Sequence, residues 1–235
     1  QSHGRYFEEK TGRWEWQRAP VFTTVEDMYT QSYVLPFLIP MLENAGAYIL
    51  CPRERDIQNN EVICDNDPSF EGPRQQGLRL AGDFRESGKW SVAGTGFADS
   101  KPIYTGNDNP FTMGTSRKSD CVREQGGNAS TIWTPDIPER GEYAVYISYT
   151  TLPNSSETAH YTVSHLGGET GFTVNQKMGG STWIYLGTFE FDKGQKGWVR
   201  LDNGTPKGCA FKPGSAVTAD AVRFGGGMGK IARGP

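Results

Sequence analysis

The amino-acid sequence predicts an α+β chain in which a larger antiparallel β-sandwich follows a smaller N-terminal α/β unit. Residues 141–191 contain four runs rich in β-branched and aromatic residues, separated by Gly-Gly or Asn/Ser turns and by no helical period. The composition, with 30 Gly, 14 Pro, 12 Phe and 10 Tyr in 235 residues, is that of a turn-rich β protein. Closely spaced strands with no helix between them pair antiparallel, so a sandwich or jelly roll is expected.

The length and charge of the chain limit the number of its domains and the kinds of partner that it is expected to bind. The chain is long enough for one large or two small domains with a real core. Its net charge of -3 and the absence of a basic run argue against a nucleic-acid partner, and no apolar run approaches the roughly 18 residues of a membrane span. The chain begins with Gln1 rather than Met and shows no signal peptide, which indicates a processed or trimmed chain. Nothing in the sequence indicates an oligomeric state.

The first third begins with a polar loop and continues into a helix. Residues 1–20 carry Ser2-His3-Gly4 and an aromatic-basic string over residues 13–18. Thr23 and Glu26 form a capping box, and apolar positions from 28 to 45 then follow a helical period. The helix is kinked or split by Pro36 and Pro40.

Gly46 ends this helix, and a short apolar strand over residues 47–51 follows it. The polar loop 52–56, which contains Arg53 and Asp56, lies at the carboxyl end of that strand, where open α/β sheets place their sites. A domain boundary is expected between Asp65 and Gly82, because this stretch is rich in Asp, Asn, Pro and Gly. The predicted organisation is an α/β segment at 1–66, a linker at 67–82, the sandwich at 83–224 and a Gly-rich exit linker at 225–235.

The sandwich is expected to contain the following strand runs: residues 143–149, 159–165, 171–176, 183–191, 198–201 and 219–224. Residues 97–127 form a long polar insertion, which either shapes a binding surface or is decoration held by Cys121. The tail 225–230 resembles a phosphate loop only superficially, because Phe224 occupies the position of the first glycine and Ile231 that of the Ser/Thr.

The four cysteines are too widely spaced for a zinc ribbon or a redox pair. Cys51 and Cys64 lie in apolar strand-like runs, which slightly favours small buried residues over a disulfide. Cys121 and Cys209 lie in loop-like segments, where a disulfide is the more plausible state.

The N-terminal third resembles the zinc-dependent N-acetylmuramoyl-L-alanine amidases. Ser2-His3-Gly4 is similar to the family's first ligand loop, Glu26 opens a helix as the family's ligand Glu does, and residues 52–56 are similar to its Thr-Arg-x-x-Asp loop. The resemblance implies that His3 and Glu26 bind zinc, with Glu15 as the alternative carboxylate, and that Arg53 and Asp56 support the site.

One imidazole and one carboxylate suit Zn²⁺, which activates a water for attack on an amide when a third protein ligand is present. No third His and no late catalytic Glu are found, so the site is incomplete within this chain. Taken singly, His3 is an ordinary loop residue, and Glu26 is explained by capping and by the helix dipole.

The region from about Asp83 to Phe224 resembles the golvesin C-terminal-like module, also described as the carbohydrate-binding-like domain of xanthan lyases. The matching segments lie in order along the chain: residues 84–90, 129–135, 141–146, 159–163, 174–176, 183–189 and 218–224. This resemblance covers more than half of the chain. It implies a jelly-roll sandwich of the galactose-binding type.

Sugar-binding modules stack the apolar face of a pyranose on aromatic rings and bond its hydroxyls with amides and carboxylates. Trp133 and Trp183 lie within apolar strands and are expected to fill the core, while Asp220 is expected to be a buried hydrogen-bonding anchor. The remaining candidates for sugar binding are Trp90, Trp198, Asn175 and Gln176.

Two functions follow. The main hypothesis is a secreted, periplasmic or cell-surface bacterial hydrolase of peptidoglycan amide bonds that binds zinc and carries an inserted sandwich. The alternative is a non-catalytic module that binds peptidoglycan or another polysaccharide. A polysaccharide lyase activity has little support, because no base and charge neutraliser can be assembled from these residues.

Overall fold

The computed structural model describes residues 5–8, 10–11, 13–18, 21–22, 29, 33–47, 58, 60–67, 78–80, 82–98 and 109–226. The chain divides into two compact units. One comprises residues 1–55 and 228–235, and the other comprises residues 56–227.

The described part of the first unit contains a β-hairpin that the sequence did not predict. Strand β1 (Arg5–Glu8) pairs antiparallel with β2 (Arg13–Trp16), and Phe7 is the register partner of Trp14. The expectation of a polar loop is therefore wrong for Arg5–Glu8, and the aromatic-basic string over residues 13–18 begins with a strand. Charged and aromatic residues alternate at a period of two in Arg13–Trp16, which suits a paired strand.

The same unit contains the C-terminal half of the predicted helix. A π-helical turn, η1 (Val34–Leu38), leads into α2 (Ile39–Asn44). The irregular turn lies beside Pro36 and Pro40, which lack the amide hydrogen that a regular α-helix requires. Gly46 then adopts a positive φ of 87°, so the predicted helix stop is confirmed. The capping residues Thr23 and Glu26 and the predicted strand 47–51, apart from Ala47, lie outside the described residues.

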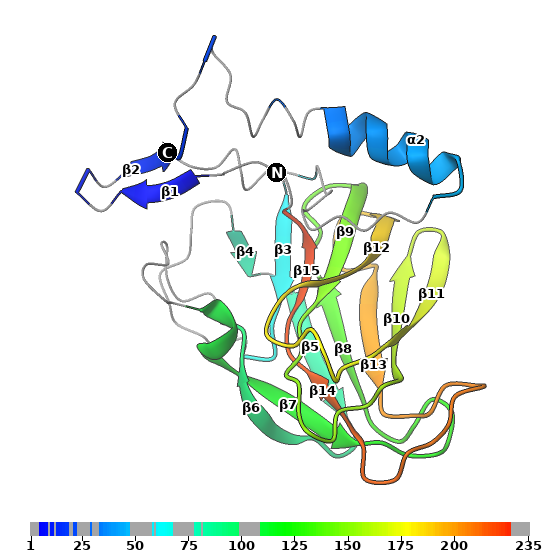
Figure 1. Cartoon of the computed structure of the whole chain (residues 1–235). Coiled ribbons are helices and arrows are strands. Elements are labelled where there is room, and N and C mark those ends of the chain that lie inside the picture. The colour runs from blue at the N-terminus through cyan, green and yellow to red at the C-terminus, as the bar shows by residue number, and fades with distance from the viewer. Residues whose placement is uncertain are drawn as a thin grey trace. The chain divides into compact units, whose positions relative to one another are not determined.

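The second unit is a sandwich of two five-stranded sheets with a smaller three-stranded sheet (Figure 1). The first five-stranded sheet has the order β11-β10-β13-β8-β5, with bounds Gly168–Val174, Ala159–His165, Trp198–Asp202, Ser130–Pro135 and Gly82–Ser87. The second has the order β12-β9-β15-β3-β4, with bounds Ile184–Phe191, Gly141–Ile147, Val222–Gly225, Glu61–Cys64 and Leu78–Leu80. All neighbours pair antiparallel except β3 and β4, which are parallel. The predicted antiparallel sandwich is confirmed.

The sandwich begins earlier in the chain than the sequence indicated. Strand β3, Glu61–Cys64, was assigned to the N-terminal segment, yet it pairs with β15 and all four of its residues are buried. Val62 and Cys64 face the main core and Ile63 faces a second apolar cluster. Because both faces of this strand are covered, it carries no polar alternation that would mark it as part of a sandwich. The predicted linker 67–82 likewise contains β4, Leu78–Leu80.

The three-stranded sheet has the order β14-β7-β6, and its central strand β7 lies within the predicted polar insertion, residues 97–127. Strand β6 is Ser91–Gly96, the 3₁₀ turn η2 is Pro110–Thr112, β7 is Gly114–Asp120 and β14 is Ala216–Ala219. The prediction of a loop is therefore wrong for β7, where the sequence is polar because one face of this small sheet is exposed.

The predicted last strand is split in two. Its first part, β14, belongs to the three-stranded sheet, and its second part, β15, lies at the centre of a five-stranded sheet between β9 and β3. The change of sheet takes place at Asp220 and Ala221, both of which are buried. Gly225 is the last residue of β15 rather than part of an exit linker, and Gly226 donates its amide hydrogen to the Gln58 oxygen over 3.1 Å.

The core lies between the two five-stranded sheets and is strongly aromatic. Trp133, Tyr161 and Phe224 have no exposed side-chain surface, and Phe191 and Phe224 pack edge to face with ring centroids 5.4 Å apart. Trp183 packs against the second cluster, 5.0 Å from the Phe97 ring. The prediction that Trp133 and Trp183 are packing residues is confirmed.

Three of the four cysteines, Cys64, Cys121 and Cys209, lie among the described residues. Cys64 is buried in the core, as predicted. Cys121 and Cys209 are half-buried and are not bridged, so the disulfide favoured for these loop positions is not formed. Cys51 lies outside the described residues. Burial raises the pKa of the Cys64 thiol and of the Cys121 thiol.

Candidate functional site

The residues predicted to bind zinc are not brought together in the part of the chain that the structure describes. His3, Glu26, Arg53 and Asp56 all lie outside the described residues. The alternative ligand Glu15 is exposed on β2, opposite Tyr6. Among the described residues no group of three or more His, Cys, Asp and Glu side chains could hold a metal ion.

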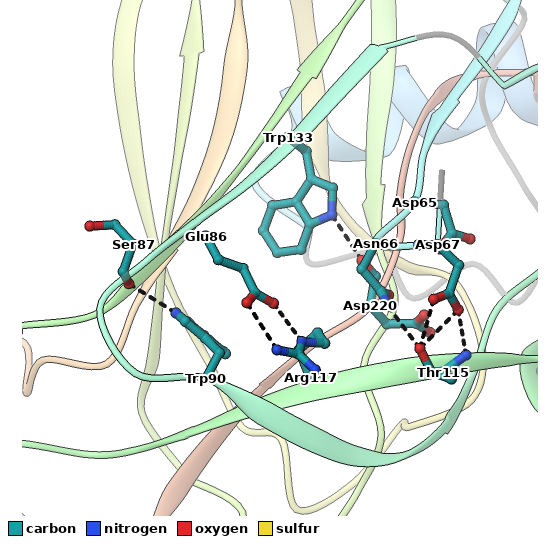
Figure 2. Close-up of polar contacts among 10 residues, drawn as sticks. All are labelled: Asp65, Asn66, Asp67, Glu86, Ser87, Trp90, Thr115, Arg117, Trp133 and Asp220. Atoms are coloured by element: carbon teal, nitrogen blue, oxygen red, sulfur yellow. Dashed lines mark hydrogen bonds and ion pairs between the residues drawn. The ribbon is translucent and has the colours of Figure 1, made fainter. Parts of the chain in front are cut away.

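The structure separates the four predicted sugar-binding residues. Trp90 lies after β5, packs against the main core, and donates its indole hydrogen to the Ser87 oxygen over 3.1 Å (Figure 2). The Trp90 ring is therefore held by the turn that follows β5. Asn175 follows β11 and is exposed, and its Oδ1 accepts the Lys177 amide hydrogen over 3.0 Å.

Gln176 is completely buried. Its Nε2 donates to the Tyr161 hydroxyl over 2.9 Å and to the Thr218 oxygen over 2.8 Å, while its Oε1 accepts the Thr218 amide hydrogen over 2.8 Å. The amide is thus saturated by the protein and joins the end of β11 to β14. Gln176 thus has no exposed surface and its amide bonds within the protein, so a role in sugar binding stays a prediction that its position does not favour.

Trp198 is the predicted residue that the fold places on an exposed sheet surface. It is the first residue of β13, and the next residue, Val199, is buried opposite Trp133. Side chains alternate across a strand, so Trp198 points away from the core. We call this side of the β11-β10-β13-β8-β5 sheet the open face. Besides Trp198, the five strands contribute to it the residues Glu169, Gly171, Thr173, His160, Thr162, Ser164, Arg200, Asp202, Ser130, Ile132, Thr134, Asp83, Arg85 and Ser87.

The residues around Trp198 on the open face are small and polar. Ser164 is its register partner on β10, and Thr162 and Thr134 occupy outward positions on the two adjacent strands. All three are half-buried. Short hydroxyl side chains cover little of a neighbouring ring and offer hydrogen-bond donors and acceptors beside it. Trp198 has no aromatic contact with a described residue.

Two charged residues follow Trp198 on β13: Arg200 lies two residues later and Asp202 four residues later. The Asp202 carboxylate is almost completely buried and accepts from His160 Nδ1 over 2.8 Å and from the Gly204 amide over 3.0 Å. Arg200 lies between Trp198 and Asp202, and its Nη2 is 3.3 Å from Asp202 Oδ2. Around β13 the open face therefore combines the Trp198 indole, hydroxyl groups and the Arg200 guanidinium, a set able to bind a ligand with an apolar face and a polar or anionic edge.

Asp220 is the buried anchor that the sequence predicted. Its carboxylate accepts the Phe97 amide hydrogen over 2.9 and 3.1 Å and the Ser148 hydroxyl over 2.5 Å, and its backbone oxygen accepts the Trp133 indole hydrogen over 2.8 Å (Figure 2). Burial raises the pKa of Asp220 to about 7. These bonds join the end of β6, the end of β9 and β8 at the point where the chain passes from β14 to β15.

A second polar network extends from the end of β3 to β7. Asp67 accepts the Thr115 amide hydrogen over 2.6 Å and the Thr115 hydroxyl over 2.8 Å, while Asp65 accepts the Asp67 amide hydrogen over 2.8 Å (Figure 2). Burial and the nearby Asp220 carboxylate raise the pKa of Asp65. On the next strand pair, Arg117 Nε and Nη2 donate to the two carboxylate oxygens of Glu86 over 2.6 and 3.0 Å. These contacts hold the small sheet to the sandwich.

The geometry thus defines an antiparallel β-sandwich domain with one open five-stranded face. A family model described as the golvesin C-terminal domain matches residues 105–226, which is just over half of the chain. The chain therefore belongs to the golvesin C-terminal domain family, and that part of the predicted resemblance is confirmed.

Two xanthan lyases show similarity to the chain. It is 36% identical over 101 residues to the xanthan lyase of Bacillus sp. (strain GL1), a match that covers 42% of this chain and 10% of the enzyme. The chain thus spans about a tenth of that curated relative. It also resembles the solved structure of Paenibacillus xanthan lyase, with a TM-score of 0.50 and 23% identity over 71% of this chain and 13% of the enzyme. The structural likeness supports the fold alone.

A family 35 carbohydrate binding module from Clostridium thermocellum is a more distant structural neighbour. Its TM-score is 0.37 and its identity 16%, over 60% of this chain and 91% of the module. These matches give no support to the amidase hypothesis. In the part of the chain that the structure describes, no helix is both long enough and apolar enough to cross a membrane.

Sequence reasoning missed Arg200, Asp202 and His160 as members of the site. A signal was present, because Trp198, Arg200 and Asp202 are spaced two apart on one strand and so share a face. The pairing of β13 with β10, which adds His160 opposite Asp202, joins residues 42 positions apart and has no local signal.

Proposed function

We propose that this chain is a carbohydrate-binding domain that binds a polysaccharide across the open face. The observation that carries the proposal is Trp198, a half-buried indole on a solvent-facing sheet surface, surrounded by hydroxyl residues and one guanidinium. A pyranose ring presents an apolar face that stacks on such a ring and a polar edge that bonds to the neighbouring groups.

The family assignment and the relatives support this proposal. The Bacillus relative is named for its action on xanthan, and the matched stretch is only a tenth of that enzyme. A segment of that size fits an accessory binding module better than a catalytic domain. The proposal corresponds to the alternative function expected from the sequence, a non-catalytic module that binds a polysaccharide. We further propose that the domain acts outside the cell, where polysaccharides such as xanthan and peptidoglycan are found.

The test is a binding measurement with the purified chain and a panel of polysaccharides that includes xanthan and peptidoglycan, by pulldown and then by calorimetry. Wild type is expected to bind at least one member. Trp198→Ala is expected to lower the affinity about tenfold or more, the loss typical of an aromatic anchor. Trp90→Ala is the matched control, because that ring is held by the core and by Ser87. Equal affinity of wild type and Trp198→Ala, or no binding to any member, would overturn the proposal.

Zinc binding through His3 and Glu26 stays a prediction of the sequence. It is separable from polysaccharide binding, which is expected to survive metal chelation because the open face holds no metal ligand set. Zinc analysis of wild type, His3→Ala and Glu26→Ala tests it. Equal zinc content in all three proteins would remove the assignment.

A further inference from the structure

We infer that the open face selects an acidic sugar, with the ring of the sugar on Trp198 and its carboxylate on Arg200. This inference rests on the proposed function and names the ligand class. It predicts a preference for polysaccharides whose units carry a carboxylate, such as uronic acids, over neutral polymers of the same backbone.

The first argument is the unused bonding capacity of Arg200. A guanidinium has five N–H donors. Among the described residues, the Arg200 guanidinium has one polar partner, Asp202 Oδ2 at 3.3 Å, and its Nε is buried with no hydrogen-bond partner. The side chain as a whole is 36% exposed. Such a guanidinium is suited to a second, incoming carboxylate.

The second argument is that the nearest carboxylate of the protein does not satisfy Arg200. Asp202 Oδ2 lies closer to His160 Nδ1, at 2.8 Å, and Asp202 Oδ1 accepts the Gly204 amide hydrogen. Elsewhere on this face Asp83 pairs with Arg85, 2.5 Å away. Asp202 and Asp83 are thus bound to other groups, and the exposed Glu169 lies two strands away from β13, on β11, which leaves the Arg200 guanidinium available to an external anion.

The third argument is the distance between Trp198 and Arg200 along β13. Trp198 and Arg200 point to the same side of β13, and residues two apart on a strand are separated by roughly 6.6 Å. This separation is comparable to the width of one sugar ring with its exocyclic group. A sugar ring stacked on the Trp198 indole therefore places the carboxylate of the sugar within reach of the Arg200 guanidinium. Thr162 and Ser164, on the adjacent strand β10, then lie beside the hydroxyl groups of the sugar.

The test uses two probes with the same backbone that differ in whether the carboxylate is free or methyl-esterified: polygalacturonate and its fully methyl-esterified form. Affinities of wild type, Arg200→Gln and Arg200→Lys are measured by calorimetry, with unfolding curves to confirm that each variant is folded. Wild type is expected to bind the acid form about tenfold more tightly or better, consistent with a charge-assisted hydrogen bond. Arg200→Gln should lose this difference and Arg200→Lys should retain part of it, because lysine keeps the charge but not the fork.

Arg140→Gln is the matched control. Arg140 is also a surface arginine in an ion pair, with Glu190 at 2.7 Å, but it lies outside the open face. It makes the same change in net charge and should leave the preference unchanged. Equal wild-type affinities for the acid and the ester would overturn the inference while leaving the proposed function standing. Loss of the preference in Arg140→Gln would also overturn it, since the effect would then come from net charge. Failure of wild type to bind any polysaccharide would overturn the proposed function as well.

Discussion

Trp133 and Trp198 lie on opposite faces of the same sheet, because Trp133 is the register partner of Val199 and Trp198 precedes Val199 by one residue. Trp133 has no exposed surface and its indole hydrogen bonds to the Asp220 oxygen over 2.8 Å. Trp198 is half-buried. One step in strand register therefore separates a core residue from a half-buried residue of the same type on the outer side of the sheet.

This relationship predicts opposite effects of two alanine substitutions. Trp133→Ala should lower the free energy of unfolding by about 3–5 kcal/mol, because it leaves a cavity and an unbonded Asp220 oxygen. Trp198→Ala should change stability by about 1 kcal/mol or less but weaken polysaccharide binding. Urea unfolding of both variants checks the first effect. A Trp198→Ala loss as large as that of Trp133→Ala would show that both rings are core residues.

Gln176 should stabilise the fold without contacting a ligand. Replacing it with Leu leaves the Tyr161 hydroxyl and the Thr218 backbone groups without their partner. The expected loss of stability is about 1–3 kcal/mol. Asn175→Ala, at the exposed neighbouring position, should change stability by about 0.5 kcal/mol or less. Unfolding curves and ligand affinities of both variants separate the two roles, and an unchanged stability in Gln176→Leu would contradict the structure.

Asp220 should make stability depend on pH. Its pKa is raised to about 7 in the folded state from an ordinary value of 3.8, so the folded protein holds this proton more tightly than the unfolded chain. The corresponding stabilisation is complete below about pH 4 and is lost as pH rises through about 7. The raised pKa of Asp65 acts in the same direction.

Thermal unfolding of wild type and Asp220→Asn between pH 4 and 8 measures this effect. The variant should show a shallower decline of stability with rising pH. Asp192→Asn is the control, because Lys196 lowers the pKa of the exposed Asp192 and its contribution is lost only in more acidic solution. Parallel curves for wild type and Asp220→Asn would rule out the titration of Asp220 as the cause.

The thiols at Cys121 and Cys209 should remain unbridged. In a Cys51→Ser background, denaturation and alkylation without reductant should label both, as read by mass spectrometry of the peptides that contain them. In native protein Cys64 should be labelled more slowly than either, because Cys64 is buried in the core and the pKa of its thiol is raised. A product in which Cys121 and Cys209 are both unlabelled would indicate a bridge between them and would contradict the structure.

Much of the second unit could be predicted from local pattern. The run Ala159–His165 coincides with β10, and the turn and strand chemistry around residues 192–201 places β13 correctly. Asp220 was identified as a buried anchor because a carboxylate in an apolar strand needs internal partners. These features depend on residues close together in the chain, where side-chain alternation reports which face is buried.

The sequence by itself determined the fold class, the strand-rich region and the side-chain alternation of runs such as residues 143–149, since these depend on neighbours two residues apart. Only the tertiary structure decided that β3 belongs to the sandwich, that Gln176 is buried and that Trp198, Arg200 and His160 share one face. The physical reason is that strand pairing joins distant segments through backbone hydrogen bonds, which every residue except proline offers alike. The partner of a strand is therefore chosen by packing across the whole core.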